Sequence, residues 1–370
     1  MKNAIKLILK NNAIFVVALF AAVITSFIVP PDREYLGYFD LKTLACLFSV
    51  LAVVSALRNI HFFEMLASSV VKVFGTARSA VLALVYITFI GSMLIANDMA
   101  LITFLPLGFF ILTTTGNEKY MAFVFIMQNI AANLGGMLTP FGNPQNLYLY
   151  TKYNIPNGEF ISIMLLPFMV SVALITVCCI IFVKKEKLTI AKREYPKPDA
   201  KRTAAYLVLF AIAIIMVFRV LPYYIGMAVI LVSLLFLDRR ALRAVDYALL
   251  FTFVCFFIFS GNMARMEPVR AFFAAFLEKS TLIFSTLSCQ FISNVPSAIL
   301  LSQFTDNYRE LLVGVNIGGT GTLIASLASL ITFREYVKHN PDKKGKYVAL
   351  FSAFNFSFLA ILLCVMYFVI

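Results

Sequence analysis

Long apolar runs separated by short polar loops dominate this sequence. Several runs extend for about 18 residues or more without a charge, the length that a helix needs to cross the hydrocarbon core of a bilayer. One such run can be a buried helix of a soluble protein, but a series of them indicates a polytopic, all-α membrane protein. The predicted complete crossings are 12–30, 39–57, 119–150, 159–183, 203–221, 223–237, 246–262, 309–333 and 347–370.

Two further apolar regions, 79–114 and 280–305, are interrupted by polar residues at their middles. A polar interruption at membrane depth is typical of a chain that turns back inside the protein. We therefore interpret both regions as re-entrant hairpins, each of which returns to the side from which it entered. The interrupting residues are Asn97-Asp98 and Ser293-Asn294.

The basic residues support this topology. They are concentrated at the N-terminus, in 184–202, at 238–243 and in 334–346. If neither hairpin crosses the membrane, all four segments lie on the same side, and the positive-inside rule makes that side the cytoplasm. This predicts a multi-pass protein of the cell (inner) membrane with a cytoplasmic N-terminus and an exterior C-terminus.

Each predicted hairpin follows an amphipathic segment (61–75 and 266–279) and precedes a glycine-rich interruption of the next apolar run. Asn-x-Gly-Gly occurs at the corresponding place in both halves, beginning at Asn133 and at Asn316. The pattern predicts two inverted repeats with re-entrant hairpins and discontinuous transmembrane helices, an architecture of many secondary transporters. The expected divisions are an N-terminal half 1–183, a basic cytoplasmic linker 184–202 and a C-terminal half 203–370.

Composition agrees with the membrane interpretation: 61% of the residues are hydrophobic, 13% are charged and the mean hydropathy is +0.91. Soluble domains carry about 25% charged residues. The net charge of +13 belongs to the loops that orient the protein, so no nucleic-acid partner is expected. The six cysteines lie in apolar segments without CxxC spacing, and neither disulfides nor a metal site is expected.

Four segments break the apolar pattern where the chain should lie deep in the membrane. Broken helices expose N–H groups and carbonyls, which can bind an anionic substrate and a coupling sodium ion respectively. A single glycine or proline break is more often an ordinary kink, but four breaks in two matching pairs favour a binding site. The segments are Ala96–Met99, Gly135–Asn146, Ser293–Ser297 and Gly318–Thr322.

Asp98 is the one carboxylate placed deep within this polar set. An ionisable residue inside the membrane is a functional-site hypothesis, here as a ligand of the coupling cation or a proton carrier. The alternative is a structural role, in which Asp98 accepts hydrogen bonds from backbone N–H groups at the start of a helix.

The four segments resemble the signature of the ion transporter superfamily, which includes divalent-anion/sodium symporters, CitM-type citrate transporters, ArsB-type arsenite permeases and NhaD-type sodium/proton antiporters. The resemblance extends from about residue 40 to 335. In the divalent-anion symporters both hairpin tips carry Ser-Asn-Thr, which binds substrate next to sodium. Asn97, Ser293 and Asn294 match that motif, whereas Ala96, Asp98 and Val295 depart from it.

The resemblance implies an elevator-like alternating access and a homodimer, with sodium as a candidate coupling ion and no other cofactor or metal. The predicted substrate-binding residues are Asn97, Gly142, Asn143, Asn146, Ser293, Asn294, Thr320 and Thr322. The predicted coupling-ion residues are Asp98, Asn97, Gly135, Thr139, Asn294 and Gly318.

The expected function is therefore secondary active transport of a small anion, with a di- or tricarboxylate such as citrate or succinate favoured, driven by a Na⁺ or H⁺ gradient. A Na⁺/H⁺ antiporter and an arsenite-type permease remain alternatives. An intramembrane enzyme would need a nucleophile beside a base, and neither histidine lies near Ser92, Ser293 or Ser297 in the predicted topology. No enzymatic activity is expected.

Overall fold

The structure, a computed structural model, describes residues 13–71, 75–187 and 199–370. Within these ranges the chain forms helices and short 3₁₀ turns, with no strand beyond one isolated bridge between Thr76 and Lys187. Eight helical segments there are long and apolar enough to cross a membrane. The chain is therefore an all-α, polytopic membrane protein, as predicted.

The first half of the chain contains α2 (Ala13–Ile28), η1 (Arg33–Tyr38), α3 (Leu41–Asn59), α4 (Phe62–Val71), α5 (Ala77–Ile95), α6 (Asn97–Thr114), η2 (Glu118–Tyr120), α7 (Met121–Gly135), η3 (Gly136–Leu138), α8 (Pro144–Lys152) and α9 (Asn157–Phe182). The second half contains α10 (Ala200–Val217), α11 (Tyr223–Leu237), α12 (Arg239–Arg243), α13 (Tyr247–Arg265), α14 (Glu267–Leu277), α15 (Thr281–Ile292), α16 (Asn294–Leu301), α17 (Tyr308–Ile317), α18 (Leu327–His339), η4 (Pro341–Lys343) and α19 (Lys344–Tyr367).

Both predicted hairpins are pairs of packed helices that meet at a single residue. α5 and α6 join at Ala96, and α15 and α16 join at Ser293. A hydroxyl caps the entry to each pair: Thr76 accepts from the N–H of Ser79, and Ser280 accepts from the N–H of Ile283. α5 and α6 are each long enough to cross a bilayer by themselves. That both pairs re-enter the membrane therefore remains a prediction from the charge pattern.

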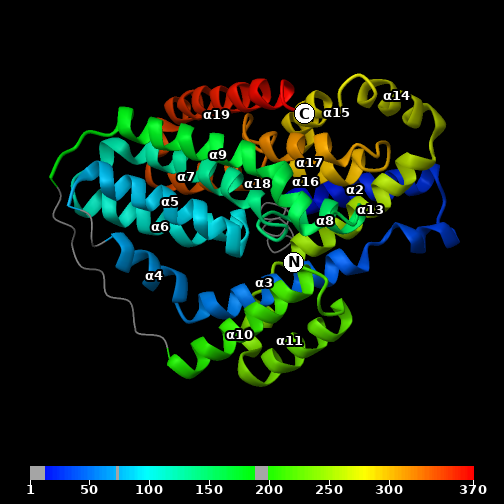
Figure 1. Ribbon diagram of the computed structural model, residues 1–370, viewed down its shortest axis with the longest axis horizontal. Helices are drawn as coiled ribbons and strands as arrows, with labels where there is room; N and C mark the ends of the chain where they lie inside the picture. The colour runs from blue at the N-terminus through cyan, green and yellow to red at the C-terminus, as the bar shows by residue number, and fades with distance from the viewer. Residues whose placement is uncertain (1–12, 72–74, 188–198) are drawn as a thin grey trace.

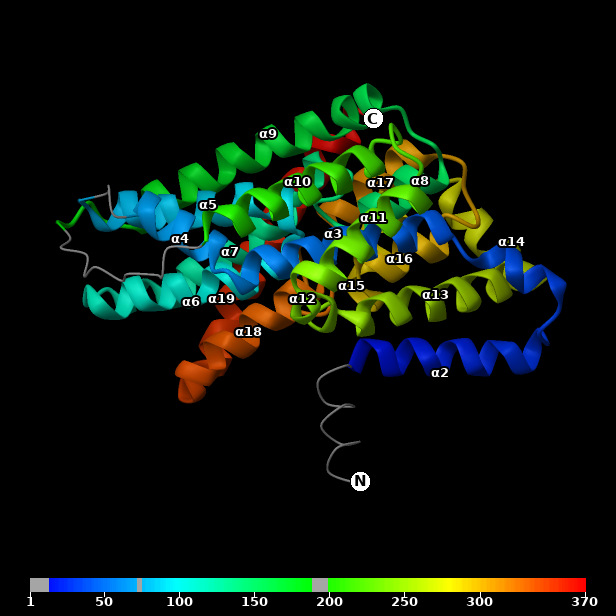
Figure 2. The ribbon, with the colours of Figure 1, turned by 90° about the horizontal axis from the view of Figure 1, so that it is seen from below.

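The helix that follows each hairpin is interrupted. Its first part packs on its own hairpin, and its second part packs on the other half of the protein. α7 packs on α5 and α6 of its own hairpin, whereas α8 packs on α16 and α17 of the other half. In the same way α17 packs on α15 and α16, whereas α18 packs on α6 and α7. Figures 1 and 2 show α5, α6 and α7 toward one end of the molecule and α13 to α16 toward the other, with the interruptions between them. The halves are interlocked through these two broken helices.

The order of elements is the same in both halves: a helix before the hairpin, the two hairpin helices, a broken helix and a long final helix. This agrees with the predicted arrangement of elements, while the inverted symmetry of the repeats stays a prediction. The division into 1–183, 184–202 and 203–370 also stays a prediction. The N-terminal lysines and most of the linker, residues 188–198, lie outside the described residues, as do residues 72–74 of the segment predicted to be amphipathic.

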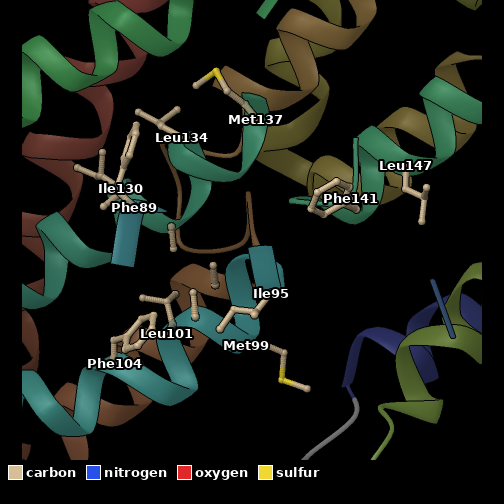
Figure 3. Close-up of a cluster of buried hydrophobic side chains, with 14 of the residues drawn as sticks. Phe89, Ile95, Met99, Leu101, Phe104, Ile130, Leu134, Met137, Phe141 and Leu147 are labelled. Atoms are coloured by element: carbon tan, nitrogen blue, oxygen red, sulfur yellow. The ribbon is translucent and has the colours of Figure 1, made fainter. Parts of the chain in front are cut away.

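Burial separates the central helices from the peripheral ones. In the most apolar window of 118–138, which contains α7, 89% of the residues are buried, against 22% for α9. Figure 3 shows why α7 is central: Ile130, Leu134 and Phe89 cluster beside the first break, and Ile95 and Met99 lie at the hairpin tip. On the outside, α2 and α11 contribute exposed apolar side chains such as Phe27 and Phe236, as expected for a surface covered by lipid.

α2 is shorter than the crossing predicted for it, 12–30, whereas α11 has the predicted bounds 223–237. They contain 16 and 15 residues, against the roughly 20 that a perpendicular crossing requires. α2 ends before Pro30, and α11 begins directly after Pro222, so prolines delimit both helices at one end.

Candidate functional site

The two hairpin tips, residues 96–98 and 293–295, have the same backbone geometry. Ala96 has φ 68° and ψ 151°, and Ser293 has φ 74° and ψ 159°. This region of backbone space is almost exclusive to glycine, and a residue with a Cβ there is strained by about 1–3 kcal/mol. Such strain is typical of functional sites.

At each tip the following asparagine stabilises the turn through its own side chain. Asn97 Oδ1 accepts from the N–H of Asp98 at 2.9 Å, and Asn294 Oδ1 accepts from the N–H of Val295 at 2.9 Å. Because the two amide oxygens are used in this way, the amide nitrogens are the groups that remain for other partners.

Asn133 and the start of α18 bring the tips together. Asn97 Nδ2 donates to Asn133 Oδ1 at 3.1 Å, and the Ser326 hydroxyl donates to the same oxygen at 2.8 Å. A Cβ added at Gly319 would lie 3.1 Å from Asn294 Nδ2 and 3.6 Å from Asn133 Oδ1. Residues of both tips and of both breaks therefore lie within a few ångströms of one another.

A second set of buried amides links the two broken helices directly. Asn143 Nδ2 and Gln145 Nε2 both donate to Asn316 Oδ1, at 3.2 and 3.4 Å. Asn316 Nδ2 in turn donates to Asn146 Oδ1 at 2.6 Å, and Asn143 Nδ2 also donates to the carbonyl of Asn133 at 3.1 Å. These contacts fix the first break against the second at the centre of the bundle.

Gln290 fixes the second break. Its Nε2 donates to the carbonyls of Gly318 and Thr320, at 2.9 and 3.1 Å, and its Oε1 accepts from the N–H of Thr322 at 2.9 Å. Gly321 has φ 120°, and a Cβ there would overlap Gln290 Oε1. One glutamine side chain thus replaces several of the backbone partners that the interrupted helix lacks.

A cavity of about 130 Å³ lies where the tips meet. Among the residues that line it are Asn97, Asp98, Gln145, Ser293, Asn294, Ser326, Asp246 and Arg334. A second cavity of about 260 Å³ adjoins it and is lined by Asp98, Asp246 and Arg58. Both cavities share Asp98, Pro144, Asp246, Leu249 and Leu327, so Asp98 lies between them.

Three buried side-chain oxygens of the first tip and the first break have no hydrogen-bond partner among the described residues. They are Asp98 Oδ1, Asn143 Oδ1 and Gln145 Oε1. Oxygen ligands of this kind suit a hard cation such as Na⁺. Across the described ranges no three His, Cys, Asp or Glu side chains form a metal-binding group.

The predicted site residues fall into two sets. Four of them, Asn97, Asp98, Ser293 and Asn294, line the tip cavity. The others lie in the surrounding network instead of on the cavity wall, namely Gly135, Thr139, Gly142, Asn143, Asn146, Gly318, Thr320 and Thr322. Gly135 packs against α5, where a Cβ would overlap the carbonyl of Phe89. The Thr139 hydroxyl donates to the carbonyl of Met93 at 2.8 Å.

The structure also adds residues that the sequence prediction did not assign to the site. Asn133, Gln290, Asn316 and Ser326 belong to the network, and Arg58, Asp246 and Arg334 line the cavities. The Asn-x-Gly-Gly repetition contained a signal for Asn133 and Asn316. No such signal marked Arg58, Asp246 and Arg334, because in the sequence they resemble ordinary charged residues of loops.

Residues 5–308 match the citrate transporter family. The chain belongs to this family. As a family member it is a membrane transporter and not an enzyme, and the resemblance of its interrupted segments to the ion transporter superfamily is confirmed.

Two curated proteins are similar to this member of the citrate transporter family over most of their length. An uncharacterized transporter of Methanocaldococcus jannaschii is 32% identical over 294 residues, which are 79% of this chain and 80% of that protein. The inner membrane protein YbiR of Escherichia coli is 25% identical over 331 residues, 88% of both chains.

Proposed function

We propose that this protein is a secondary active transporter that moves a small anion across the cell membrane, with a di- or tricarboxylate such as citrate or succinate favoured. A Na⁺ or H⁺ gradient drives the transport. The observation that carries this proposal is the convergence of Asn97, Ser293 and Asn294 from two separate hairpins on one cavity. Family membership supports an anionic substrate, and the name of the Escherichia coli relative, an inner membrane protein, supports an inner-membrane location.

Asn294 is the first substrate ligand in this proposal. Its Nδ2 donates to no protein acceptor within the described residues, although only 3% of the residue is exposed, so it can donate to an anion in the cavity. Asn97, Ser293 and Ser326 complete a wall of neutral hydrogen-bonding groups. Neutral donors hold a carboxylate while allowing its release, which a carrier requires.

Asp98 is the coupling residue in this proposal. Its Oδ1 is buried without a hydrogen-bond partner in the described chain, and the residue lines both cavities. A cation bound there would offset the negative charge that otherwise repels an anion at the neighbouring tip. Binding of the two ions would then be mutually dependent, which is the thermodynamic requirement for coupling. The carbonyls and hydroxyls of Gly135, Thr139 and Gly318 are the predicted additional ligands of that ion.

The tips and both broken helices are proposed to move together as the transport unit of a homodimer. The amides that join the halves support a single moving body, because each buried bond that lost its partner would be costly by about 1–3 kcal/mol. Relative movement inside this network is therefore disfavoured compared with movement of the network as a whole.

Uptake by the purified protein in liposomes tests the function. Radiolabelled citrate, succinate and sulfate are offered separately, first under an inward Na⁺ gradient and then under an inward proton gradient. We expect accumulation of a carboxylate with one of the two gradients. Accumulation of none of the anions under either gradient would contradict the proposal.

A Na⁺/H⁺ antiporter is the second candidate, and the buried, unpartnered carboxylate oxygen of Asp98 is the observation that favours it. In the same liposomes, an imposed Na⁺ gradient would then move protons without any anion, as a pH-sensitive dye inside the vesicles would report. Arsenite accumulation in a parallel assay would instead identify an arsenite-type permease.

A further inference from the structure

An anion in the tip cavity faces a problem of charge. Two carboxylates, Asp98 and Asp246, line the same cavity, and neither has a salt-bridge partner among the described residues. Asp246 Oδ1 accepts from the N–H of Leu249 at 3.0 Å and thereby caps α13, which fixes its position beside the cavity. A coupling cation bound at Asp98 would offset one of these charges, but Asp246 would still repel the distal carboxylate of a di- or tricarboxylate unless a second positive charge lies within reach.

Arg334 is the cation that lines this cavity. It lies on α18 and forms no ion pair in the described parts of the chain. The neighbouring Glu335 is used elsewhere, since it contacts Lys338 Nζ at 3.4 Å and His339 Nε2 at 3.1 Å. The guanidinium of Arg334 is therefore available to a ligand.

The position of Arg334 sets the distance between the two ends of the site. α18 begins at the tips, where its N-cap Ser326 donates to Asn133. Arg334 follows eight positions later, which at 1.5 Å per residue is about 12 Å along the helix axis. Long side chains in helices lean toward the N-terminus, and for Arg334 this is the direction of the tips. A longer ligand held at Asn294 can therefore contact the guanidinium more readily than a compact anion can.

We infer that Arg334 is a specificity-determining residue, which binds the distal carboxylate of a di- or tricarboxylate whose first carboxylate is held by the hairpin tips. Guanidinium suits this role because it binds a carboxylate with two parallel N–H···O bonds. The inference rests on the proposed function and deepens it. It predicts that selection against small inorganic anions depends on a side chain of α18 and not only on the tips.

The test is the affinity of the purified protein for citrate, succinate and sulfate, measured by titration calorimetry in sodium buffer and again in choline buffer at low pH. For Arg334→Gln the dissociation constants of citrate and succinate should rise about tenfold, which corresponds to 1.4 kcal/mol. The sulfate constant should change by less than about twofold, because sulfate at the tips contacts Arg334 less readily. Arg334→Lys should recover part of the citrate affinity.

Lys338→Gln is the matched control. It removes the same charge from the same helix one turn later, at a position that does not line the cavity. It should leave all three affinities unchanged. If Arg334→Gln weakened the binding of sulfate and citrate equally, or if Lys338→Gln lost the same affinity for citrate, Arg334 would act only through the surface potential. Either result would overturn the inference.

The outcomes separate the inference from the function on which it rests. If the wild-type protein binds carboxylates and Arg334→Gln binds them equally well, the inference fails while the proposed function stands. If the wild type binds none of the anions in either buffer, both fail. Arg334 is exposed, so the variants are expected to fold, and an unchanged thermal denaturation curve confirms this.

Discussion

The two hairpin tips differ in chemistry although they share one backbone. Ala96 and Ser293 have nearly the same dihedral angles, and the asparagine after each closes the turn with a bond of the same length. The first tip then places a carboxylate at Asp98, where the second places Val295. A common scaffold thus supports two different polar surfaces, of which only one is ionisable.

The tips also differ in how they are held. Asn97 Nδ2 is engaged by Asn133, whereas Asn294 Nδ2 has no protein acceptor in the described chain. The backbone N–H of Asn294 instead donates to the carbonyl of Ala325 at 2.9 Å, and the Ser293 hydroxyl donates to the same carbonyl at 3.3 Å. This difference fits the proposal that the first tip binds the coupling cation and the second tip binds most of the anion.

The largest expected effect follows from neutralising the charge that distinguishes the tips. A hydrogen bond or ion contact to a charged group contributes about 1.5–3 kcal/mol, so Asp98→Asn should weaken binding of the coupling ion by about 100-fold and abolish gradient-driven accumulation. The folded protein should remain intact. Liposome uptake together with size-exclusion chromatography measures both properties. Normal gradient-driven uptake by Asp98→Asn would refute the assigned role.

Replacing each tip asparagine separately should distinguish an effect on substrate binding from an effect on stability. Asn294→Ala removes the free amide donor, and we expect a rise in KM for the carboxylate of about tenfold, since one hydrogen bond to a charged group is lost. Asn97→Ala breaks the bond to Asn133 inside a buried network and should lower the free energy of unfolding by about 1–3 kcal/mol. Uptake kinetics and thermal denaturation in detergent distinguish the two effects. Identical changes in both variants would show that the tips do not differ in function.

The smallest expected effect concerns the strained residues themselves. Ala96→Gly should raise the free energy of unfolding by about 1 kcal/mol, because glycine adopts this backbone region without steric strain. Ser293→Gly should gain less, because it also loses the hydroxyl bond to the carbonyl of Ala325. Thermal denaturation of both variants in one detergent provides the comparison. A destabilised Ala96→Gly would mean that the backbone there is not strained.

The fold was largely predictable because its signals are local. Apolar runs, glycine and proline placed the helices, and the polar residues at 97 and 294 placed both tips to within a residue of the observed turns at Ala96 and Ser293. A helix break needs only a few adjacent residues that disfavour helix, so it is visible in a single sequence. The family resemblance was carried by the same short segments.

The charged part of the site was not predictable, because it depends on how distant elements pack. Arg334 belongs to a basic segment that the topology explains fully, and only the course of α18 brings it into the cavity. Asp246 likewise resembles an ordinary N-cap, a role that it also performs. Gln290 lies in an apolar run, and its function as a brace for 318–322 requires the second break to fold over it. Contacts between side chains that are far apart in the sequence leave no pattern in one sequence.

The exchange of α8 and α18 between the halves has a consequence for how the protein is made. The first break enters the membrane with Asn133 and Asn143 before their partners Ser326 and Asn316 have been synthesised. Unsatisfied amides at membrane depth are unfavourable, so the early half must remain hydrated or pair its amides in another way until α17 and α18 arrive. The polar centre of this transporter can accordingly be completed only after α17 and α18 have been inserted, although part of it is translated much earlier.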